Sequence, residues 1–403
     1  MTTGPLEGVR VLDLTRVLAG PFATLLLADL GAQVWKVEHP AQGDETRQIP
    51  PLANGESHYF ASINRNKKSV AIDLKDPRGR ELALGLAARA DVVVENFRPK
   101  VAERLGLSYD HLRAGNPGLV YCSISAFGQT GPWADRTAFD VSIQALSGLM
   151  SLTGEPGGAP VRAGLPMADL TAGLMGVVGI LSALVERDKS GLGQYVDTSM
   201  LDSMVGMLTY LAGRWFMTGE EVSRVGSGHP SAVPYGAYPT ADGHIVLATL
   251  YESYWPVLCR AVGRGDLADD PELATNEQRL ARRAEVDAEL SSTLTTRTTA
   301  AWEEVFGALD LPTAPILSVG EVLSHPQVTA RGLVHEIDHP RLGHTGVVGP
   351  TVSFSRSSAP EPAPAPLLGQ DTAEVLSSVL GLSDEQIAAL IRGGVVAAQT
   401  FGG

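Results

Sequence analysis

Short apolar runs alternate with longer amphipathic stretches through the first half of the chain. Strand-length runs rich in valine, leucine and isoleucine lie at residues 9–14, 33–38, 70–74, 91–95 and 119–125. Helical periodicity lies between them, for example over residues 22–30 and over 77–90, where Asp76-Pro77 is expected to start the helix. Helices are also predicted over residues 139–150 and 199–217. Parallel strands need a long crossover, usually a helix, so this alternation indicates βαβ units. The pattern therefore predicts the α/β fold class, with a large domain built on a parallel sheet.

The pattern changes near Thr218, where a polar segment interrupts the apolar helices. A hairpin is predicted over residues 234–249, followed by two or three helices that reach about residue 309. Two more helices are predicted after the proline-rich connector at residues 359–366, and the second opens with a capping box, Ser383-x-x-Gln386. We expect four segments: the N-terminal part of the large domain at 1–217, a linker at 218–225, a smaller α+β domain at 226–325, and a return to the large domain over 326–403.

Polar and small residues follow several of the predicted strands. Lys75 follows the strand at 70–74, and Asn96-Phe97-Arg98 follows the strand at 91–95. Ligands of doubly wound α/β sheets bind at the carboxyl ends of strands. A single basic residue there is most often a solvated surface charge, but several on successive strand ends favour a binding site. The first strand–helix turn has one glycine where a dinucleotide fingerprint needs three, which excludes NAD and FAD.

Asp169 stands where a turn leads into the longest apolar helix, predicted over residues 170–187. A carboxylate there meets free N–H groups and the positive end of the helix dipole. Aspartate is also a favoured N-cap residue, which is its usual role at such a junction. The functional alternative is a carboxylate kept ionised by backbone donors, with small neighbours, Ala168, Ala172 and Gly173, that leave room for a ligand. The segment alone leaves both interpretations open.

The formal net charge of −14 argues against a nucleic-acid or anionic-membrane partner. Cys122 and Cys259 lie far apart with no CxxC pair, so neither a disulfide framework nor a thiolate metal site is expected. The N-terminus lacks the pattern of a signal peptide, and the most apolar run, residues 170–185, is shorter than a membrane span. We expect a soluble cytoplasmic protein without a bound metal.

Eight short motifs together point to a known family. In chain order they read LDLTRVLAGP, DLGAQVWKVE, NRNKKSVAIDLK, VVENFRP, FGQTGP, GLPMADLTAG, GQYVDTSM and PLLGQDTAEVL. With these motifs the chain resembles the family III (CaiB/BaiF type) coenzyme A transferases over nearly its full length. The resemblance implies a Rossmann-like large domain made from both chain termini, a small domain joined to it by two linkers, and two subunits that interlock as a homodimer.

The resemblance also implies a site. Asp169 falls on the family's catalytic aspartate, and Gly228 and His229 fall on the glycine loop that closes over the reacting acyl group. The positions that resemble its CoA-binding region are Val17, Leu18, Ala19, His39, Ile72, Lys75, Asn96, Phe97, Arg104, Phe139 and Met200. The implied substrates are an acyl-CoA and a small carboxylic acid, with no permanently bound cofactor. The implied reaction passes through an anhydride and a thioester of the aspartyl carboxylate.

Two other functions compete with acyl transfer. The related α-methylacyl-CoA racemases move a proton, with a His-Asp pair where this chain has Phe139 and Asp140. Phenylalanine cannot act as a base, which favours the transferase, and Asp140 by itself is typical of a helix cap. A non-catalytic CoA-binding module would require that Asp169 be dispensable.

Departures from one branch of the family bear on specificity. The formyl-CoA/oxalate branch has glutamine where Leu18 stands and arginine where His39 stands. Residues 226–245 look more like members that use succinyl-CoA and dicarboxylic acids. The sequence therefore favours a dicarboxylate substrate without naming the donor or the acceptor.

Overall fold

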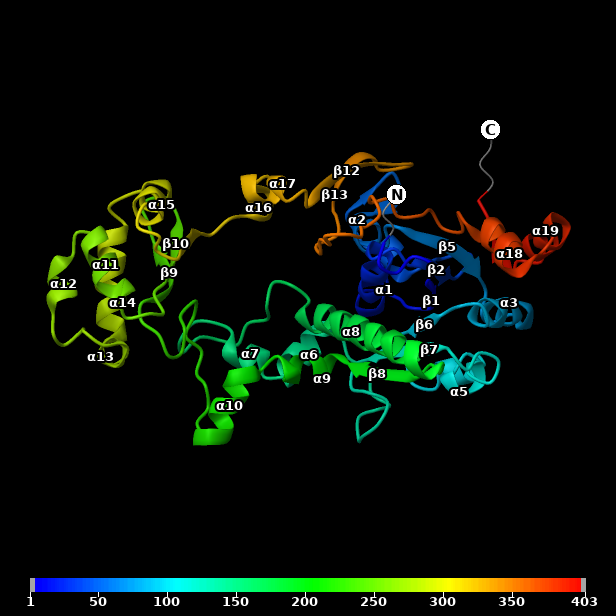
Figure 1. Cartoon of the computed structure of the whole chain (residues 1–403), viewed down its shortest axis with the longest axis horizontal. Coiled ribbons are helices and arrows are strands. Elements are labelled where there is room, and N and C mark those ends of the chain that lie inside the picture. The colour runs from blue at the N-terminus through cyan, green and yellow to red at the C-terminus, as the bar shows by residue number, and fades with distance from the viewer. Residues whose placement is uncertain (1–3, 400–403) are drawn as a thin grey trace. The chain divides into compact units, whose positions relative to one another are not determined.

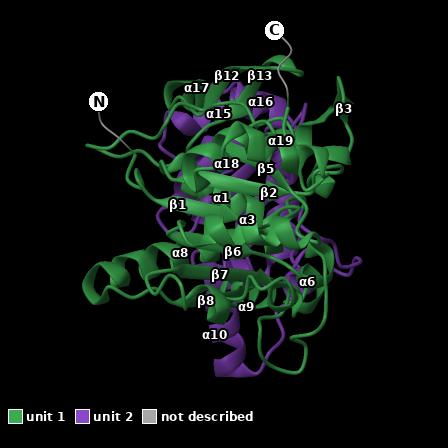
Figure 2. Ribbon diagram, turned by 90° about the vertical axis from the view of Figure 1, so that its right-hand side faces the viewer, with its two compact units in different colours: residues 1–147, 164–208, 326–403 green, residues 148–163, 209–325 purple. Residues whose placement is uncertain are grey.

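A computed structural model describes residues 4–399 of the chain (Figure 1). The chain forms two compact units, which Figure 2 colours separately. Unit 1 comprises residues 1–147, 164–208 and 326–403, and unit 2 comprises residues 148–163 and 209–325. Unit 2 thus also includes residues 148–163 and 209–217, which were expected in the N-terminal part of the large domain. The boundaries expected at 217, 225 and 325 stay a prediction about folding domains.

Unit 1 is built on a seven-stranded sheet in the order β14-β5-β2-β1-β6-β7-β8. Its strands are β1 (Arg10–Asp13), β2 (Gln33–Glu38), β5 (Lys67–Ile72), β6 (Val92–Glu95), β7 (Val120–Ser125), β8 (Tyr195–Ser199) and β14 (Val396–Ala397). All pair in parallel except β14, which is antiparallel to β5. The predicted α/β class and parallel sheet are confirmed, and the edge strand β14 is an addition that the sequence pattern did not indicate.

Helices cover both faces of this sheet. They are α1 (Ala19–Asp29), α3 (Pro77–Ala87), α5 (Tyr109–Leu112), α6 (Asp140–Leu146), α8 (Met167–Ser190), α9 (Met200–Gly206), α18 (Thr372–Leu380) and α19 (Asp384–Arg392). α8 packs on β7 and β8 and against α1, α6 and α9. α3, α5, α18 and α19 share a buried core with the other face of the strands. The C-terminal helices thus return to the N-terminal strands, beside β5 in Figure 1.

Local sequence signals set several helix ends as predicted. The Asp76 side chain accepts a hydrogen bond from Arg78 N at 2.8 Å, and Pro77 is the first residue of α3. Ser383 and Gln386 form the predicted capping box of α19. These ends depend on residues within one helical turn, which is why the sequence alone locates them.

α8 is longer than expected, because it begins at Met167 and continues for 24 residues. Its N-cap is Pro166, so the interpretation of Asp169 as the N-cap is wrong; Asp169 lies inside the first turn. By length and composition alone, α8 could cross a membrane, and half of its most apolar window is buried in the protein. The argument that this apolar segment is too short for a span is therefore wrong for the whole helix, although a core helix of a soluble protein passes the same test.

The small residues near Asp169 bring two helices together. Ala168 and Ala172 are fully buried, and a Cβ added to Gly173 would lie 2.8 Å from the carbonyl oxygen of Ala19. Close approach of α8 to the start of α1 requires small side chains here. The expectation that they leave room for a ligand is wrong, because backbone atoms of α1 fill that space.

Two predicted helices are broken in the structure. The helix expected over 139–150 is α6 followed by α7 (Leu149–Leu152), interrupted at Gly148. The helix expected over 199–217 is α9 followed by α10 (Thr209–Thr218), with Thr209 at φ +41°. Both breaks fall where the chain passes from one unit to the other.

The remaining elements of unit 1 are short. They are η1 (Glu45–Gln48), β3 (Leu52–Ala53), β4 (Glu56–Ser57), α2 (His58–Ile63), α4 (Val101–Arg104), α17 (Pro326–Ala330), β12 (Val334–His339) and β13 (Gly343–Val348). β12 and β13 form an antiparallel hairpin that the sequence pattern did not predict.

Unit 2 has a three-stranded antiparallel sheet in the order β11-β10-β9. The strands of this sheet are β9 (Tyr235–Pro239), β10 (His244–Ala248) and β11 (Thr313–Pro315). The helices beside them are α11 (Tyr254–Ala261), α12 (Gly265–Asp269), α13 (Asn276–Ala281), α14 (Arg283–Leu294), α15 (Thr299–Gly307) and α16 (Val319–Leu323). The predicted hairpin is confirmed as β9–β10. Five helices, α11 to α15, occupy the segment where two or three were expected, and they share one buried core with the sheet.

Candidate active site

The turn between β1 and α1 carries three residues predicted to contact CoA. Leu18 and Ala19 are each only 5 % exposed, so their side chains are buried. Val17 has φ +65°, a left-handed conformation that β-branched residues rarely adopt. Such strain persists only where the surroundings hold it, and it concentrates at ligand sites. The turn therefore has the backbone character of a binding element.

A small pocket lies beside this turn, at the carboxyl ends of β1, β2 and β5. Its lining brings together four predicted residues, His39, Ile72, Lys75 and Phe97. Arg16 also lines it, with its guanidinium 5.8 Å from the centre of the Phe97 ring. Two exposed cations, Arg16 and Lys75, beside an aromatic ring suit a ligand with phosphates and a planar base. Sequence analysis missed Arg16, although its neighbours in the motif were singled out.

Asn96 holds the turn in place. Its Oδ1 accepts a hydrogen bond from Arg16 N at 2.8 Å, and its Nδ2 donates to Arg16 O at 2.8 Å. This reciprocal pair fixes the main chain of Arg16 across a separation of 80 residues in sequence. A predicted ligand contact thus has a structural partner that sequence spacing did not reveal.

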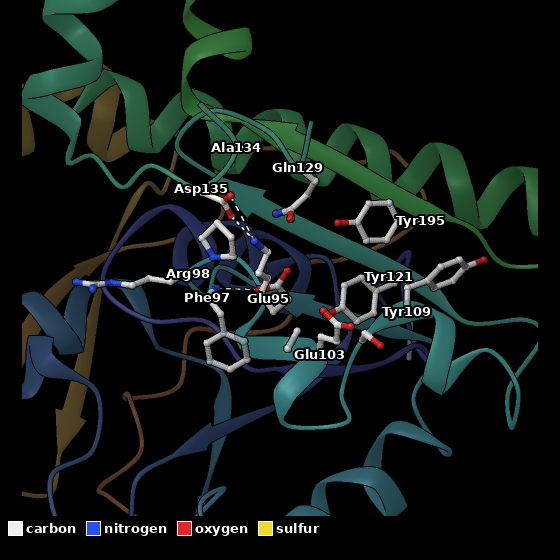
Figure 3. Close-up of a pocket in the computed structure, with 14 residues that line it drawn as sticks. Glu95, Phe97, Arg98, Glu103, Tyr109, Tyr121, Gln129, Ala134, Asp135 and Tyr195 are labelled. Carbon is white, nitrogen blue, oxygen red and sulfur yellow. Dashed lines mark hydrogen bonds and ion pairs between the residues drawn. The ribbon is translucent and has the colours of Figure 1, made fainter. Parts of the chain in front are cut away.

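Phe97 also lines a second pocket, with a volume of about 230 Å³ (Figure 3). Glu95 lies in its wall and accepts a hydrogen bond from Phe97 N at 2.8 Å; burial raises the pKa of Glu95. Lys100 and Asp135 in the lining form an ion pair of 3.1 Å, and Figure 3 shows Asp135 on the opposite side of the pocket from Tyr195. Apart from Phe97, none of its lining residues belongs to the predicted CoA set.

Three further predicted residues line neither pocket. Arg104 is the last residue of α4 and is exposed. Phe139, which precedes α6, is 78 % exposed, and Met200, the first residue of α9, is buried. The structure therefore gathers His39, Ile72, Lys75 and Phe97 in one pocket and leaves these three outside it.

Asp140 caps the helix that carries Asp169. The Asp140 Oδ1 accepts hydrogen bonds from Ala168 N at 2.8 Å and from Asp169 N at 3.4 Å. Asp140 Oδ2 accepts from Gln144 Nε2 at 2.6 Å, which fixes the carboxylate. Because Asp140 satisfies these backbone donors, the Asp169 carboxylate is left for another partner. Over residues 4–399, the structure shows no hydrogen bond to that carboxylate.

Asp169 also titrates far from its ordinary range. Burial raises the pKa of Asp169 to about 7, and the negative charge of Asp140 adds to the rise. Tyr59, on α2, lies within the electrostatic influence of both groups. Burial and the charges of Asp169, Asp44 and Asp140 raise the pKa of Tyr59 to about 12. A carboxyl group with a strongly perturbed pKa beside a protonated hydroxyl is typical of a functional site.

Known proteins similar to this chain have a common function. Residues 6–372 match the model of CoA-transferase family III. The chain belongs to this family. A succinyl-CoA:glutarate CoA-transferase of Mus musculus is 43 % identical over 393 residues, which cover 97 % of this chain and 90 % of the relative. A succinate–glutarate CoA-transferase of Agrobacterium fabrum is 40 % identical over 389 residues, covering 93 % of this chain and 96 % of the relative.

A solved structure agrees with this assignment. The crystal structure of a CaiB/BaiF family protein from Brucella suis superposes with a TM-score of 0.85 at 36 % identity, covering 94 % of this chain and all of that one. The protein is therefore a CoA-transferase enzyme, and acyl-CoA is its substrate. The transferase prediction is confirmed over the racemase alternative.

The segment predicted to form the glycine loop, which includes Gly228 and His229, lies in unit 2. His229 N donates to Tyr235 O at 3.2 Å, and His229 Nδ1 accepts from Ser231 N at 3.1 Å. Arg283 Nη2 donates to His229 O at 2.6 Å. Gly228 lies in the same hydrogen-bonded turn, where an added Cβ would be 2.9 Å from Val225 O. The turn is ordered by its own contacts, and its role in closing over the acyl group stays a prediction.

Metal ligation has no candidate in the described part of the enzyme. Over residues 4–399, no group of three or more histidine, cysteine, aspartate or glutamate side chains could hold a metal ion. Cys122 and Cys259 are both buried and free, and burial raises the pKa of each thiol. These thiols therefore lack the thiolate character of reactive cysteines.

Proposed function

We propose that this CoA-transferase moves CoA from a donor acyl-CoA to a dicarboxylic acid through covalent intermediates on Asp169. The observation that carries the proposal is the state of the Asp169 carboxyl. It lies in the first turn of α8, its backbone N–H is bonded to Asp140, and its pKa is about 7. A carboxylate with that pKa is ionised in a large fraction of molecules at neutral pH and is weakly solvated, which suits a nucleophile.

The reaction balances without any other reactant. The Asp169 carboxylate attacks the thioester carbonyl of the donor, and a mixed anhydride forms as CoA thiolate leaves. The thiolate attacks the aspartyl carbonyl of the anhydride, which gives an aspartyl-CoA thioester and frees the donor acid. The acceptor carboxylate attacks this thioester and expels the thiolate again. Finally the thiolate attacks the acceptor carbonyl of the new anhydride, which yields the product acyl-CoA and restores Asp169.

Two groups near Asp169 support stabilisation of the oxyanions formed in these steps. The raised pKa of Tyr59 keeps its hydroxyl protonated, so it can donate a hydrogen bond. The N-terminal turn of α8 places the positive end of a 24-residue helix dipole at the carboxyl. Both effects favour negative charge that develops at this place in the transition state.

The pocket beside the β1–α1 turn is the proposed site for the nucleotide part of CoA. Arg16 and Lys75 supply positive charge for phosphates, and Phe97 supplies a ring face. The strained turn at Val17 lies beside this pocket and is the proposed contact for the rest of the ligand. Gly173 brings this turn and α8 into direct contact, so the pocket beside the turn and Asp169 on α8 belong to neighbouring elements.

The similarity to relatives supports the choice of a dicarboxylate. The mouse and Agrobacterium fabrum proteins are named as succinyl-CoA:glutarate and succinate–glutarate CoA-transferases. We infer that succinyl-CoA is a competent donor and that glutarate is a competent acceptor. The departures at Leu18 and His39 from the formyl-CoA/oxalate branch agree with this choice.

Exchange assays test both parts of the proposal. Succinyl-CoA is mixed with glutarate, with succinate labelled at carbon, or with the monocarboxylate butyrate, and product acyl-CoA is quantified. We expect rapid exchange with both dicarboxylates and at least about a hundredfold lower kcat/KM with butyrate, which lacks the second charge.

Asp169→Asn should abolish exchange while the folded protein still binds CoA. Equal use of butyrate would refute the dicarboxylate assignment, and an active Asp169→Asn enzyme would refute the nucleophile.

A further inference from the structure

The β1–α1 turn is strained, and something must hold it. Val17 is in the left-handed region at φ +65°, although its side chain branches at Cβ. The two residues that follow, Leu18 and Ala19, enter α1 with buried side chains. Backbone strain of this kind relaxes unless neighbouring groups fix the conformation. The groups that contact the main chain of the turn therefore decide whether it keeps its shape without a ligand.

Four charged side chains lie buried beneath the turn, and we call them the buried quartet: Asp13, Lys36, Asp44 and Lys67. Each side chain is at most 1 % exposed. Lys36 Nζ lies 2.9 Å from Asp44 Oδ2, and Lys67 Nζ lies 3.1 Å from Asp13 Oδ2. Two lysines and two aspartates balance in charge, which satisfies the requirement that buried charges be paired.

Three members of the quartet bond to the main chain of the turn, and Thr15 N donates to Asp13 Oδ1 at 2.9 Å. Lys36 Nζ donates to Thr15 O at 3.0 Å, and Val17 N donates to Asp44 Oδ1 at 3.3 Å. The ion pair thus connects the residue before Arg16 with the residue after it. Asn96 holds the main chain of Arg16 itself from β6. Every residue from Thr15 to Val17 therefore has its backbone tied to a fixed side chain.

Stability alone is a poor explanation for the Lys36–Asp44 pair. Two buried charges lose their hydration, and well-packed apolar residues of similar volume are often as stable or more stable. An apolar pair could fill the space, but it could not accept from Val17 N or donate to Thr15 O. What the charged pair adds is a fixed geometry for these two backbone groups.

We propose that Lys36 and Asp44 are positioning residues for CoA binding, which hold the Thr15–Val17 backbone in its ligand-binding conformation before CoA arrives. This inference rests on the proposed CoA site. Neither side chain reaches the ligand, because both are buried beneath the turn. Their contribution is preorganisation, since a turn that is already ordered loses less conformational entropy on binding.

The chain offers a matched control. Arg65 and Asp29 form another buried ion pair in unit 1, with side chains 5 % and 6 % exposed. Asp29 is bonded to Arg65 and Asn66, and among residues 4–399 it makes no hydrogen bond to the turn. Loss of either pair leaves a buried charge without its partner, so both losses should lower the unfolding temperature. Only loss of the quartet pair should change the binding of CoA.

The test measures CoA affinity and turnover in the full-length enzyme. Lys36→Met, Asp44→Asn and Asp29→Asn are compared with the wild type by titration calorimetry with CoA, by kinetics with succinyl-CoA, and by thermal unfolding. We expect Lys36→Met to raise Kd for CoA and KM for succinyl-CoA about tenfold or more, with kcat at saturation within about twofold. Asp29→Asn should lower the unfolding temperature and leave Kd within about twofold of the wild type.

A rescue variant separates positioning from general destabilisation. Glycine adopts a left-handed φ without strain, so Val17→Gly should recover part of the affinity that Lys36→Met loses. If Lys36→Met does not fold, Asp44→Asn decides the question with the same measurements. Unchanged CoA affinity in the variants of the quartet, or an equal loss in Asp29→Asn, would overturn the inference. A wild-type enzyme that binds no CoA, or a Lys75→Ala variant with unchanged Kd, would instead overturn the proposed CoA site.

Discussion

Asp169 combines a place in the first turn of a long helix with a carboxyl that is hard to ionise. Helix N-termini usually lower the pKa of a carboxyl group, yet burial and Asp140 raise this one to about 7. Asp140 takes over the capping of α8 and at the same time adds a second negative charge. The same neighbour thus leaves the Asp169 carboxylate unengaged and makes it a stronger base, which are the two properties that a nucleophile needs.

This arrangement predicts the pH dependence of activity. Only the ionised Asp169 attacks the thioester, so kcat/KM should rise with pH and level off above about pH 7. Asp140→Asn removes one negative charge but keeps an oxygen that can accept from Ala168 N. The substitution should move the rising limb of the profile to lower pH, because it removes the Asp140 charge that helps to raise the pKa of Asp169. Burial, the larger cause, remains, so the pKa of Asp169 should stay above its ordinary value. A rate profile that is flat between about pH 5.5 and 8 would contradict the assignment.

The same pKa shift predicts a cost in stability. The folded state holds the Asp169 proton up to about pH 7, whereas the unfolded chain releases it near the ordinary aspartate pKa of 3.8. The folded state binds more protons in this window, so the free energy of unfolding falls as pH rises from about 4 to 7. Asp169→Asn removes this loss. Its unfolding temperature should exceed that of the wild type, and by more at pH 8 than at pH 5; thermal scans at both values measure this.

At the scale of elements, the contact between α8 and α1 depends on the missing side chain of Gly173. A Cβ there would lie 2.8 Å from Ala19 O and 3.0 Å from the Phe22 ring, so Gly173→Ala should push the two helices apart. We expect a net loss of stability, because overpacking of about 1–3 kcal/mol outweighs the gain in helix propensity. CoA affinity should fall as well, since Ala19 belongs to the strained turn.

Gly213→Ala is the matched control for this substitution. Gly213 lies within α10, and an added Cβ meets no atom within 4 Å. The gain in helix propensity is then unopposed, so chemical denaturation should show a stabilisation of up to about 1 kcal/mol. Equal effects of the two substitutions would show that the approach of α8 to α1 is not tight.

Elements whose ends depend on neighbouring residues could be predicted from the sequence. The Asp76-Pro77 start of α3, the capping box of α19 and the β9–β10 hairpin around Asp242-Gly243 are of this kind. Contacts between distant residues could not be predicted. Asp140 caps α8 from a position 28 residues before Ala168, and α8 begins at Met167 and not at the expected residue 170. Tyr59 has no neighbouring motif that relates it to Asp169.

In the candidate site, too, features set by neighbouring residues could be predicted from the sequence, whereas contacts between distant residues could not. The motif around Val17 could be recognised in the sequence. Its left-handed backbone, however, is held by Lys36 and Asp44, whose segments have the pattern of an ordinary strand and loop. Apolar periodicity placed Lys36 in a buried strand without indicating what its charge would meet. The residues of the pocket could therefore be named from the sequence, whereas the network that holds them required the structure.

At the scale of the whole molecule, exposed apolar side chains support the predicted homodimer. On α10, Phe216 is 78 % and Met217 88 % exposed, and on α8, Val178 and Val185 are each more than half exposed. Apolar residues that recur along exposed helix faces usually mark an interface. We expect light scattering to give about twice the chain mass of 42.4 kDa. A substitution of Phe216 by glutamate should weaken the dimer, and a monomeric wild type at micromolar concentration would contradict the prediction.

The most direct test of the central claim is to trap the covalent intermediate. Wild-type enzyme is incubated with succinyl-CoA and no acceptor, treated with hydroxylamine, digested and analysed by mass spectrometry. An aspartyl thioester or anhydride is converted by hydroxylamine to a hydroxamate on the side chain. We predict this modification on the peptide that contains Asp169, and its absence in Asp169→Asn and in samples without succinyl-CoA. Modification of a different residue, or rapid exchange with no modified peptide, would contradict the account.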